Sequence, residues 1–252
     1  MEKDFRAVRK AKPAFNGKTE TMTRLTSLGV VLISSVLVFS LAQGQSQIPS
    51  LNEIVAKVQG QYDAHGDFKA DFVQESLVKS LGRKQVSEGV VFFKKPGKMR
   101  WNYQTPFKQE IVSDGKTLWS YNPAEKQVMV TPMSQAAQGK VPSTFLAGLG
   151  NLRLDFQVRW AKEPSPQENY FLELTPNEFQ GSLEKLFLLI DRENFRILQA
   201  KIQDIMGNTT QISFSKTQFD NRLPDSLFTF TPPKGVEVFQ MPGVSPPGKT
   251  GK

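Results

Sequence analysis

Three side chains of types that bind metals lie close together: Asp63, His65 and Asp67 alternate along the chain. Carboxylate and imidazole groups at this spacing could share one metal ion. They fall where a helical pattern gives way to a strand pattern, and Asp and His commonly serve as cap and turn residues at such junctions. We therefore predict solvated junction residues, and a metal site is the less favoured hypothesis.

Composition excludes most other chemistry. The chain has 252 residues, no cysteine and one histidine, which rules out disulfides, thiol nucleophiles, iron–sulfur clusters and the lipidated cysteine of a bacterial lipoprotein. The carboxylate pairs Asp71/Glu75 and Asp191/Glu193 have no identifiable neighbour that would tune a pKa for acid–base catalysis. Since phosphate-binding glycine loops and nucleophile elbows are also missing, the sequence predicts a protein that is not an enzyme and needs no cofactor or metal.

Aromatic and basic residues interleave between Lys98 and Tyr103. As a strand, this segment places Met99, Trp101 and Tyr103 on one face and its basic residues on the other. The preceding strand pattern puts Val91, Phe93 and Lys95 on one face. Ordinary hydrophobic core is the simplest interpretation of these side chains. A cavity for an apolar ligand and a platform for stacking nucleic-acid bases are the alternatives.

The N-terminal region indicates export. Leu28–Ala42 is an uncharged stretch of 15 residues, too short for a comfortable membrane span of about 20 residues. Ser40 and Ala42 stand where a signal peptidase reads small residues, which predicts cleavage after Ala42. Cleavage after Gly44 and an uncleaved membrane anchor are the alternatives. The basic segment before the apolar stretch is unusually long, so translation could instead start at Met22.

Removal of residues 1–42 lowers the net charge from +8 to +4. Half of the apparent basicity therefore belongs to the targeting segment. Because export also removes the protein from nucleic acids, we reject the nucleic-acid interpretation of the aromatic and basic strand.

The remaining pattern predicts one helix followed by many strands. Leu51–Tyr62 has helical spacing, with Ser50 as N-cap, Glu53 three residues later and Gly66 as the stop. Period-two alternation and frequent turn signals, such as Asp114-Gly115, then indicate an antiparallel meander. The predicted strands run from Asp67 onward and include 85–95, 98–103, 152–160, 170–175, 183–191, 195–204 and 209–219.

A short apolar helix, Pro142–Leu149, interrupts the strands and would be either a lid or a plug of core. We predict a mainly β (α+β) fold, a strongly curved antiparallel sheet that forms an unclosed barrel around its helices. Its expected extent is 43–239, after a targeting segment 1–42 and before a disordered tail rich in Pro, Gly and Lys at 240–252.

Four strings of sequence resemble one known family. They are DFKADFVQ at 67–74, FKKPGKMRW at 93–101, IVSDGKTLWSYNP at 111–123 and FTFTPPKGV at 228–236. These strings are similar to those of the periplasmic outer-membrane lipoprotein carrier proteins, the LolA family. The resemblance extends over essentially all of residues 48–239.

The resemblance implies an unclosed barrel with a helical lid over an apolar cavity for the acyl chains of a lipoprotein. Bulky and adaptable side chains suit such a cavity. The residues expected to line it are Tyr62, Phe68, Phe72, Val91, Phe93, Met99, Trp101 and Tyr103, and those expected in the lid are Phe145, Leu146 and Leu149.

One position departs from the family. Many members carry an arginine before the proline matched by Pro96, and that arginine is thought to hydrogen-bond the lid closed. This sequence has Lys95 there. Lysine has three rotatable donors instead of a planar fork, so we expect a weaker or differently arranged lid latch.

The resemblance also implies a function and partners. The family members are periplasmic chaperones that receive lipoproteins from an ATP-driven inner-membrane complex and pass them to an outer-membrane acceptor, without binding nucleotide. We accordingly expect a monomeric carrier with no nucleic-acid partner. A periplasmic regulatory domain of the same fold that senses lipids or lipoproteins is the alternative, and a periplasmic hydrolase is a third hypothesis.

Overall fold

The structure is a computed structural model that describes residues 49–136, 150–178 and 182–240. All of these residues belong to the unit Gln47–Lys252. Three predicted features lie outside the described residues: the targeting segment 1–42, the helix Pro142–Leu149 with its lid residues Phe145, Leu146 and Leu149, and the tail beyond Gln240.

A single sheet of twelve strands accounts for most of the described residues. Its spatial order is β12-β6-β5-β4-β3-β2-β1-β11-β10-β9-β8-β7. The strands are β1 (Asp67–Val78), β2 (Arg83–Lys94), β3 (Lys98–Thr105), β4 (Gln109–Asp114), β5 (Thr117–Asn122), β6 (Gln127–Pro132), β7 (Phe156–Trp160), β8 (Tyr170–Pro176), β9 (Leu183–Ile190), β10 (Ile197–Asp204), β11 (Thr209–Phe219) and β12 (Glu237–Gln240).

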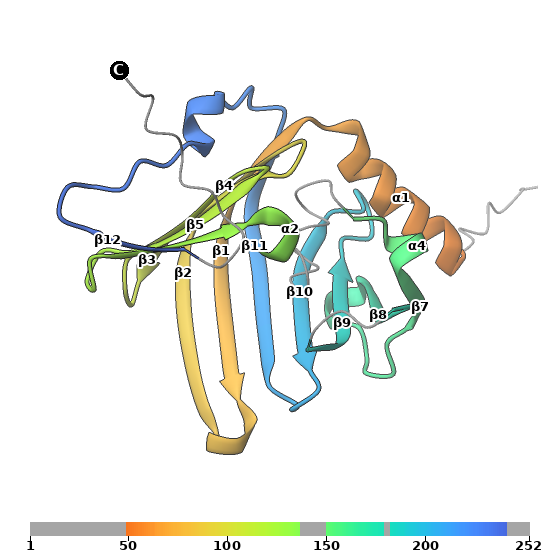
Figure 1. Ribbon diagram of the computed structural model, residues 1–252. Coiled ribbons are helices and arrows are strands. Elements are labelled where there is room, and N and C mark those ends of the chain that lie inside the picture. Colours follow the sequence, from red (N-terminus) through yellow and green to blue (C-terminus); the bar gives the residue numbers. More distant parts are fainter. Residues whose placement is uncertain (1–48, 137–149, 179–181, 241–252) are drawn as a thin grey trace, which may run out of the picture. The chain divides into compact units, whose positions relative to one another are not determined.

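Two antiparallel meanders make up this sheet. Strands β1–β6 and β7–β11 each pair with their neighbours in sequence, and β1 pairs with β11 to join the two halves. The edge strand β12 is the exception, since it pairs in parallel with β6. Figure 1 shows the strong curvature of the sheet, which remains open between β12 and β7. The predicted fold class is confirmed.

Helix α1 (Leu51–Ala64) begins at the predicted N-cap. The Ser50 hydroxyl accepts a hydrogen bond from the Glu53 backbone N–H at 3.3 Å, and the Glu53 carboxylate accepts one from the Ser50 N–H at 2.7 Å. This capping box satisfies two N–H groups that a helix terminus otherwise leaves without partners. The helix ends at Ala64, and the backbone of the C-cap residue His65, directly before the predicted stop at Gly66, is extended.

One predicted strand is wrong over its first half. The structure has a short helix, α4 (Leu152–Asp155), where the sequence pattern predicted a strand from Leu152 to Trp160. The Asn151 side chain accepts hydrogen bonds from the N–H groups of Arg153 and Leu154, and Asp155 accepts one from the Asn151 N–H. These local caps override the alternation of apolar residues, and the strand β7 starts only at Phe156.

In the described parts of the chain, the remaining helical elements are single turns. They are α2 (Met133–Ala136) and the 3-10 turns η1 (Lys79–Leu81), η2 (Pro166–Glu168) and η3 (Asp225–Phe228). The η3 turn lies against β3 and β4 on the face of the sheet opposite α1, where Asp225 forms ion pairs with Lys94 and Lys98. These two ammonium groups lower the pKa of Asp225 to about 2.

The larger hydrophobic core lies between α1 and one face of the sheet, which we call the inner face. A smaller separate cluster on β8 and β9 consists of Phe171, Phe187 and Leu189. Along β1 and β2, buried inner-face positions alternate with more exposed ones, as expected for a sheet with a single buried face. Each large apolar side chain buried in this way stabilises the fold by about 1.5–3 kcal/mol. Helix α1 contributes Ile54, Val55, Val58 and Tyr62 to this core.

Close packing of the inner face predicts opposite effects of the same substitution at two glycines. A Cβ at Gly89 would lie 2.0 Å from the Asn102 carbonyl oxygen and 2.9 Å from the Phe72 ring, whereas Gly60 in α1 has nothing within 4 Å. We expect Gly89→Ala to lower the free energy of unfolding by about 1–3 kcal/mol and Gly60→Ala to raise it by about 0.5–1 kcal/mol. Urea unfolding followed by circular dichroism measures both, and wild-type stability of Gly89→Ala would contradict this packing.

Candidate ligand-binding site

The predicted cavity residues come together on the inner face. Phe68, Phe93 and Met99 are cross-strand neighbours on β1, β2 and β3, and the next row pairs Val91 with Trp101. The rings form a continuous set of contacts. Centroid distances are 4.8 Å for Phe68–Phe93, 4.9 Å for Phe72–Trp101, 5.0 Å for Phe72–Tyr103 and 5.6 Å for Tyr62–Phe68.

Seven of these eight side chains are packed within the core. Tyr62, Phe68, Phe72, Val91, Phe93, Met99 and Trp101 are each no more than 5% exposed. The eighth, Tyr103, is partly exposed and is the one that reaches an open cavity. The interpretation as hydrophobic core therefore describes the arrangement in this structure, and the row of aromatic rings ends at the cavity wall.

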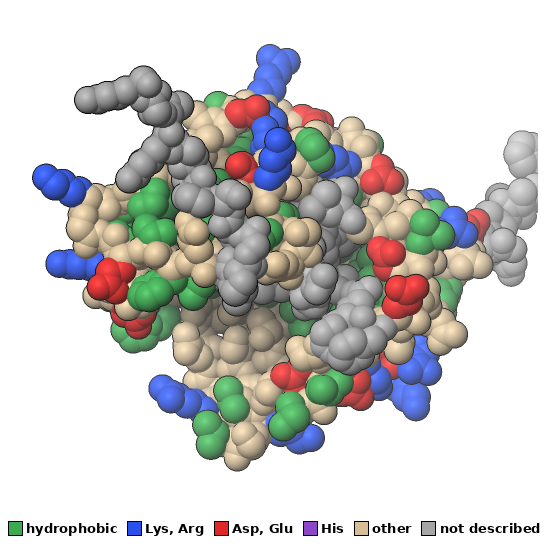
Figure 2. Space-filling view, in the orientation of Figure 1, with side chains coloured by type: hydrophobic (Ala, Val, Ile, Leu, Met, Phe, Trp, Pro, Cys, Tyr) green, Lys and Arg blue, Asp and Glu red, His purple; other side chains and the backbone are tan. Residues whose placement is uncertain are grey.

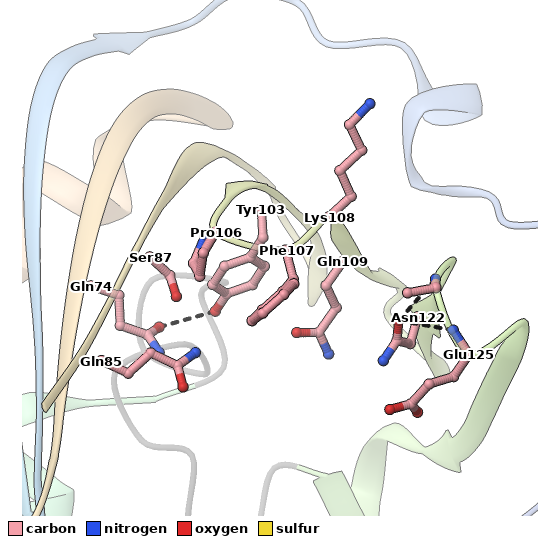
Figure 3. A pocket seen from close by; sticks show the side chains of 11 residues that line it. Gln74, Gln85, Ser87, Tyr103, Pro106, Phe107, Lys108, Gln109, Asn122 and Glu125 are labelled. Atoms are coloured by element: carbon pink, nitrogen blue, oxygen red, sulfur yellow. Dashed lines mark hydrogen bonds between the residues drawn. The ribbon is translucent and has the colours of Figure 1, made fainter. Parts of the chain in front are cut away.

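The cavity has a volume of about 390 Å³ and lies where β1, β2 and β3 meet the loop between β3 and β4. Its volume is in the range of small-molecule pockets. Figure 3 shows the rings of Tyr103 and Phe107 between two groups of polar side chains. The other lining residues are Gln74, Gln85, Ser87, Pro106, Lys108, Gln109, Asn122, Ala124 and Glu125.

Hydrogen bonds hold several of the polar lining residues in place. The Tyr103 hydroxyl donates to the Gln74 side-chain oxygen at 3.0 Å, as drawn in Figure 3. The Gln109 amide donates to the Ser120 hydroxyl at 3.2 Å, and the Asn122 side chain accepts from the N–H of Ala124 at 3.1 Å. The lining thus combines two aromatic rings with fixed amide and hydroxyl groups.

Sequence reasoning missed the polar part of this cavity. Gln74 continues the alternation of Phe68, Ala70 and Phe72, so strand parity alone could have placed it on the inner face. The same holds for Ser87 on β2, which is opposite Gln74. Phe107 lies in a loop, and no periodic signal places a loop side chain.

Lys95 contacts the C-terminal end of α1. Its ammonium donates a hydrogen bond to the Tyr62 carbonyl at 2.5 Å and lies 3.8 Å from the Asp63 carboxylate. The Lys95 backbone N–H donates to the Gly66 carbonyl. A cation at this position is favourable because the last carbonyls of a helix carry partial negative charge. Lys95 therefore ties β2 to α1, and the predicted partners in the lid lie outside the described residues.

The residues at the junction of helix and strand serve separate structural contacts. His65 Nδ1 lies 2.6 Å from the Asp220 carboxylate, and its ring stacks on Phe219 at 4.4 Å. The Asp67 carboxylate accepts hydrogen bonds from the N–H groups of Asn221 and Leu223. Within the described part of the chain, no three His, Asp or Glu side chains are grouped so that they could hold a metal ion.

The aromatic and basic residues of β3 lie on opposite faces of the sheet. Trp101 is buried on the inner face, whereas Arg100 donates to the Leu227 carbonyl and forms an ion pair with Glu110. Base stacking requires exposed rings beside free cations. This arrangement does not offer them on β3.

Residues 65–231 match the family described as outer membrane lipoprotein carrier protein LolA. The chain belongs to this family. The outer-membrane lipoprotein carrier protein of Dechloromonas aromatica is 34% identical over 170 residues, which are 68% of this chain and 79% of the relative. The carrier protein of Nitrosomonas europaea is 31% identical over 216 residues, 86% of this chain and 100% of the relative.

A solved LolA superfamily protein from Nitrosomonas europaea is also similar, with 17% identity and a TM-score of 0.42 over 73% of this chain and 99% of that chain. The resemblance of the four sequence strings to the LolA family is thus confirmed by the family match. Both of these relatives are named outer-membrane lipoprotein carrier proteins. Among the described helices, none has the length and apolar character needed to cross a membrane.

The tyrosines of the inner face predict how stability depends on pH. Burial raises the pKa of Tyr103 to about 12 and raises that of Tyr62 well above its usual value. An unfolded chain loses these protons near pH 10, so the unfolded state binds fewer protons and the free energy of unfolding falls as the pH rises above 10. Tyr103→Phe removes one contribution and should make this fall less steep. Urea unfolding at a series of alkaline pH values measures the slope, and equal slopes for both proteins would contradict the burial of this phenol.

Proposed function

We propose that the protein is a periplasmic chaperone that carries lipoproteins and shelters their acyl chains against the inner face of the sheet. The observation that supports this proposal is the row of aromatic and apolar side chains from α1 to the cavity at Tyr103. Each acyl CH₂ group removed from water contributes about 0.8 kcal/mol. A free lipoprotein therefore needs an apolar surface of this kind to cross an aqueous compartment.

Membership in the LolA family supports the direction of transport. In this proposal the chain is exported by a cleavable signal peptide that ends near Ala42 and works in the periplasm. It receives acylated lipoproteins from an ATP-driven complex of the inner membrane and delivers them to an acceptor in the outer membrane. The carrier itself needs no cofactor for this exchange, because the energy enters at the inner membrane.

Packing of the inner face supports a mechanism of competition. Phe68 contacts both Tyr62 and Phe93 in the core, so an acyl chain gains access to these rings only when α1 or another covering segment moves. The free energy needed to break the contacts between this segment and the inner face then opposes the free energy gained on binding the acyl chain. Such an equilibrium keeps the affinity low enough for the cargo to leave at the acceptor.

The contact of Lys95 with the end of α1 makes this residue the proposed latch. We predict that Lys95→Leu impairs release of cargo to the acceptor and leaves loading intact, because the closed state loses the hydrogen bond between the Lys95 ammonium and the Tyr62 carbonyl. Lys95→Arg is the matched control and should retain transfer, since it keeps a cationic donor. Transfer of an acylated lipoprotein from each purified complex to the acceptor measures release. Normal transfer by Lys95→Leu would refute the latch.

Native mass spectrometry tests the carrier function directly. The protein is purified from the periplasm of cells that co-express a tagged lipoprotein, and a variant of that lipoprotein without its lipidated cysteine is the control. We expect a one-to-one complex that depends on the acyl chains. A protein that stays empty, or that holds only phospholipid, would contradict the carrier and favour a lipid sensor of the same fold.

A further inference from the structure

Exposed apolar side chains gather at one end of the sheet. Of the thirteen large apolar side chains that are exposed among the described residues, six belong to the hairpin between β1 and β2 or to the turn between β10 and β11. We call this group the tip patch. It consists of Leu77, Val78, Leu81, Val86, Ile205 and Met206. The hairpin is the lowest point of Figure 1, and Figure 2 shows hydrophobic side chains protruding there beside Lys and Arg side chains.

The two segments of the tip patch are fixed to each other. The Lys79 backbone N–H donates a hydrogen bond to the Asn208 side chain at 3.0 Å. The Asp204 carboxylate accepts bonds from the N–H groups of Met206 and Asn208, which closes the turn. A Cβ at Gly207 would lie 2.8 Å from the Lys79 side chain. The exposed side chains are thus presented by a defined backbone.

Three cations surround the tip patch. Lys79, Arg83 and Lys84 fall within six consecutive residues that contain no acidic residue. Lys84 forms an ion pair with Glu75 at 2.5 Å, while no ion pair of Lys79 or Arg83 occurs among the described residues. Protruding apolar side chains beside free cations suit the interface of a membrane with anionic lipids, where apolar groups enter the headgroup region and each cation adds attraction.

We propose that the tip patch docks on the surface of a bilayer that contains anionic lipids. A lipid surface fits better than a protein partner because the patch protrudes, whereas a stable protein interface needs a large complementary area of about 1,600 Å². The proposal rests on the contacts at the tip and goes beyond the carrier function, which requires no direct contact with a bilayer.

Docking at the tip patch would also bring the cavity close to the membrane. Gln74 lines the cavity and lies four residues along β1 from Val78 of the patch, and Gln85, which also lines the cavity, is directly followed by Val86 of the patch. Four residues of a strand span about 13 Å at 3.3 Å per residue. The open side of the inner face would then stand next to the headgroups, where acyl chains enter or leave.

Vesicle binding tests the proposal. The exported protein, with its N-terminus checked by mass, is mixed with vesicles of phosphatidylcholine alone or with phosphatidylglycerol added, and bound protein is measured by flotation. We expect binding to the anionic vesicles that weakens at high salt. Leu81→Ser should lower the partition coefficient about tenfold, and Lys79→Gln should lower it about fivefold on anionic vesicles only.

Leu154→Ser is the matched control, because Leu154 on α4 and Leu81 are equally exposed, at 74% and 72%. Thermal unfolding checks that each variant is folded, and the control should bind like the wild type. The absence of cysteine allows single labels at Leu81→Cys and Leu154→Cys. An environment-sensitive dye should report an apolar surrounding at position 81 only. Equal vesicle binding of the two serine variants, or equal dye responses at positions 81 and 154, would overturn the proposal. Shielding of the tip patch by a protein partner, with no shielding by vesicles, would also overturn it.

Discussion

Pairing of β1 with β11 joins the N-terminal and C-terminal meanders in a register that runs from Phe68 opposite Phe219 to Leu77 opposite Thr209. Without it, each meander would be a separate sheet with one face open to water. With it, one continuous inner face extends across twelve strands, and α1 covers part of that face. The same pairing places His65 beside Asp220 and Lys79 beside Asn208, so both ends of the two central strands are held by contacts between distant segments.

Much of this fold could be predicted from the sequence, because its signals are local. The capping box at Ser50 and Glu53, the alternation along β1 and the turn at Asp114-Gly115 each depend on residues a few positions apart. The order of the strands could not be derived in this way, since the paired residues of β1 and β11 are 132 to 151 positions apart, from Leu77–Thr209 to Phe68–Phe219. The parallel partner of β6, β12, was missed because Glu237–Gln240 is too short to show a period. At Leu152–Asp155, the capping by Asn151 outweighed a strand-like pattern.

The candidate site was predictable to a lesser degree. Strand parity placed Met99, Trp101 and Tyr103 on one face correctly, but parity does not tell a filled core from a cavity wall. That distinction depends on how closely α1 packs against the inner face of the sheet. It also depends on the β3–β4 loop, which brings Phe107 next to Tyr103 (Figure 3). The partner of Lys95 was likewise inaccessible to sequence reasoning, because the Tyr62 carbonyl is a backbone group with no signature of its own.

An open sheet leaves two edges at which strands of another molecule could add. Here the strands of 11 and 12 residues, β1, β2 and β11, lie in the interior of the sheet, and the edges β7 and β12 have five and four residues. At about 3.3 Å per residue, these edges present only about 17 and 13 Å of unpaired backbone. Short edges are a known defence against edge-to-edge aggregation. The sheet can therefore stay open for a ligand, because its short edges, without closure into a barrel, protect the molecule against aggregation.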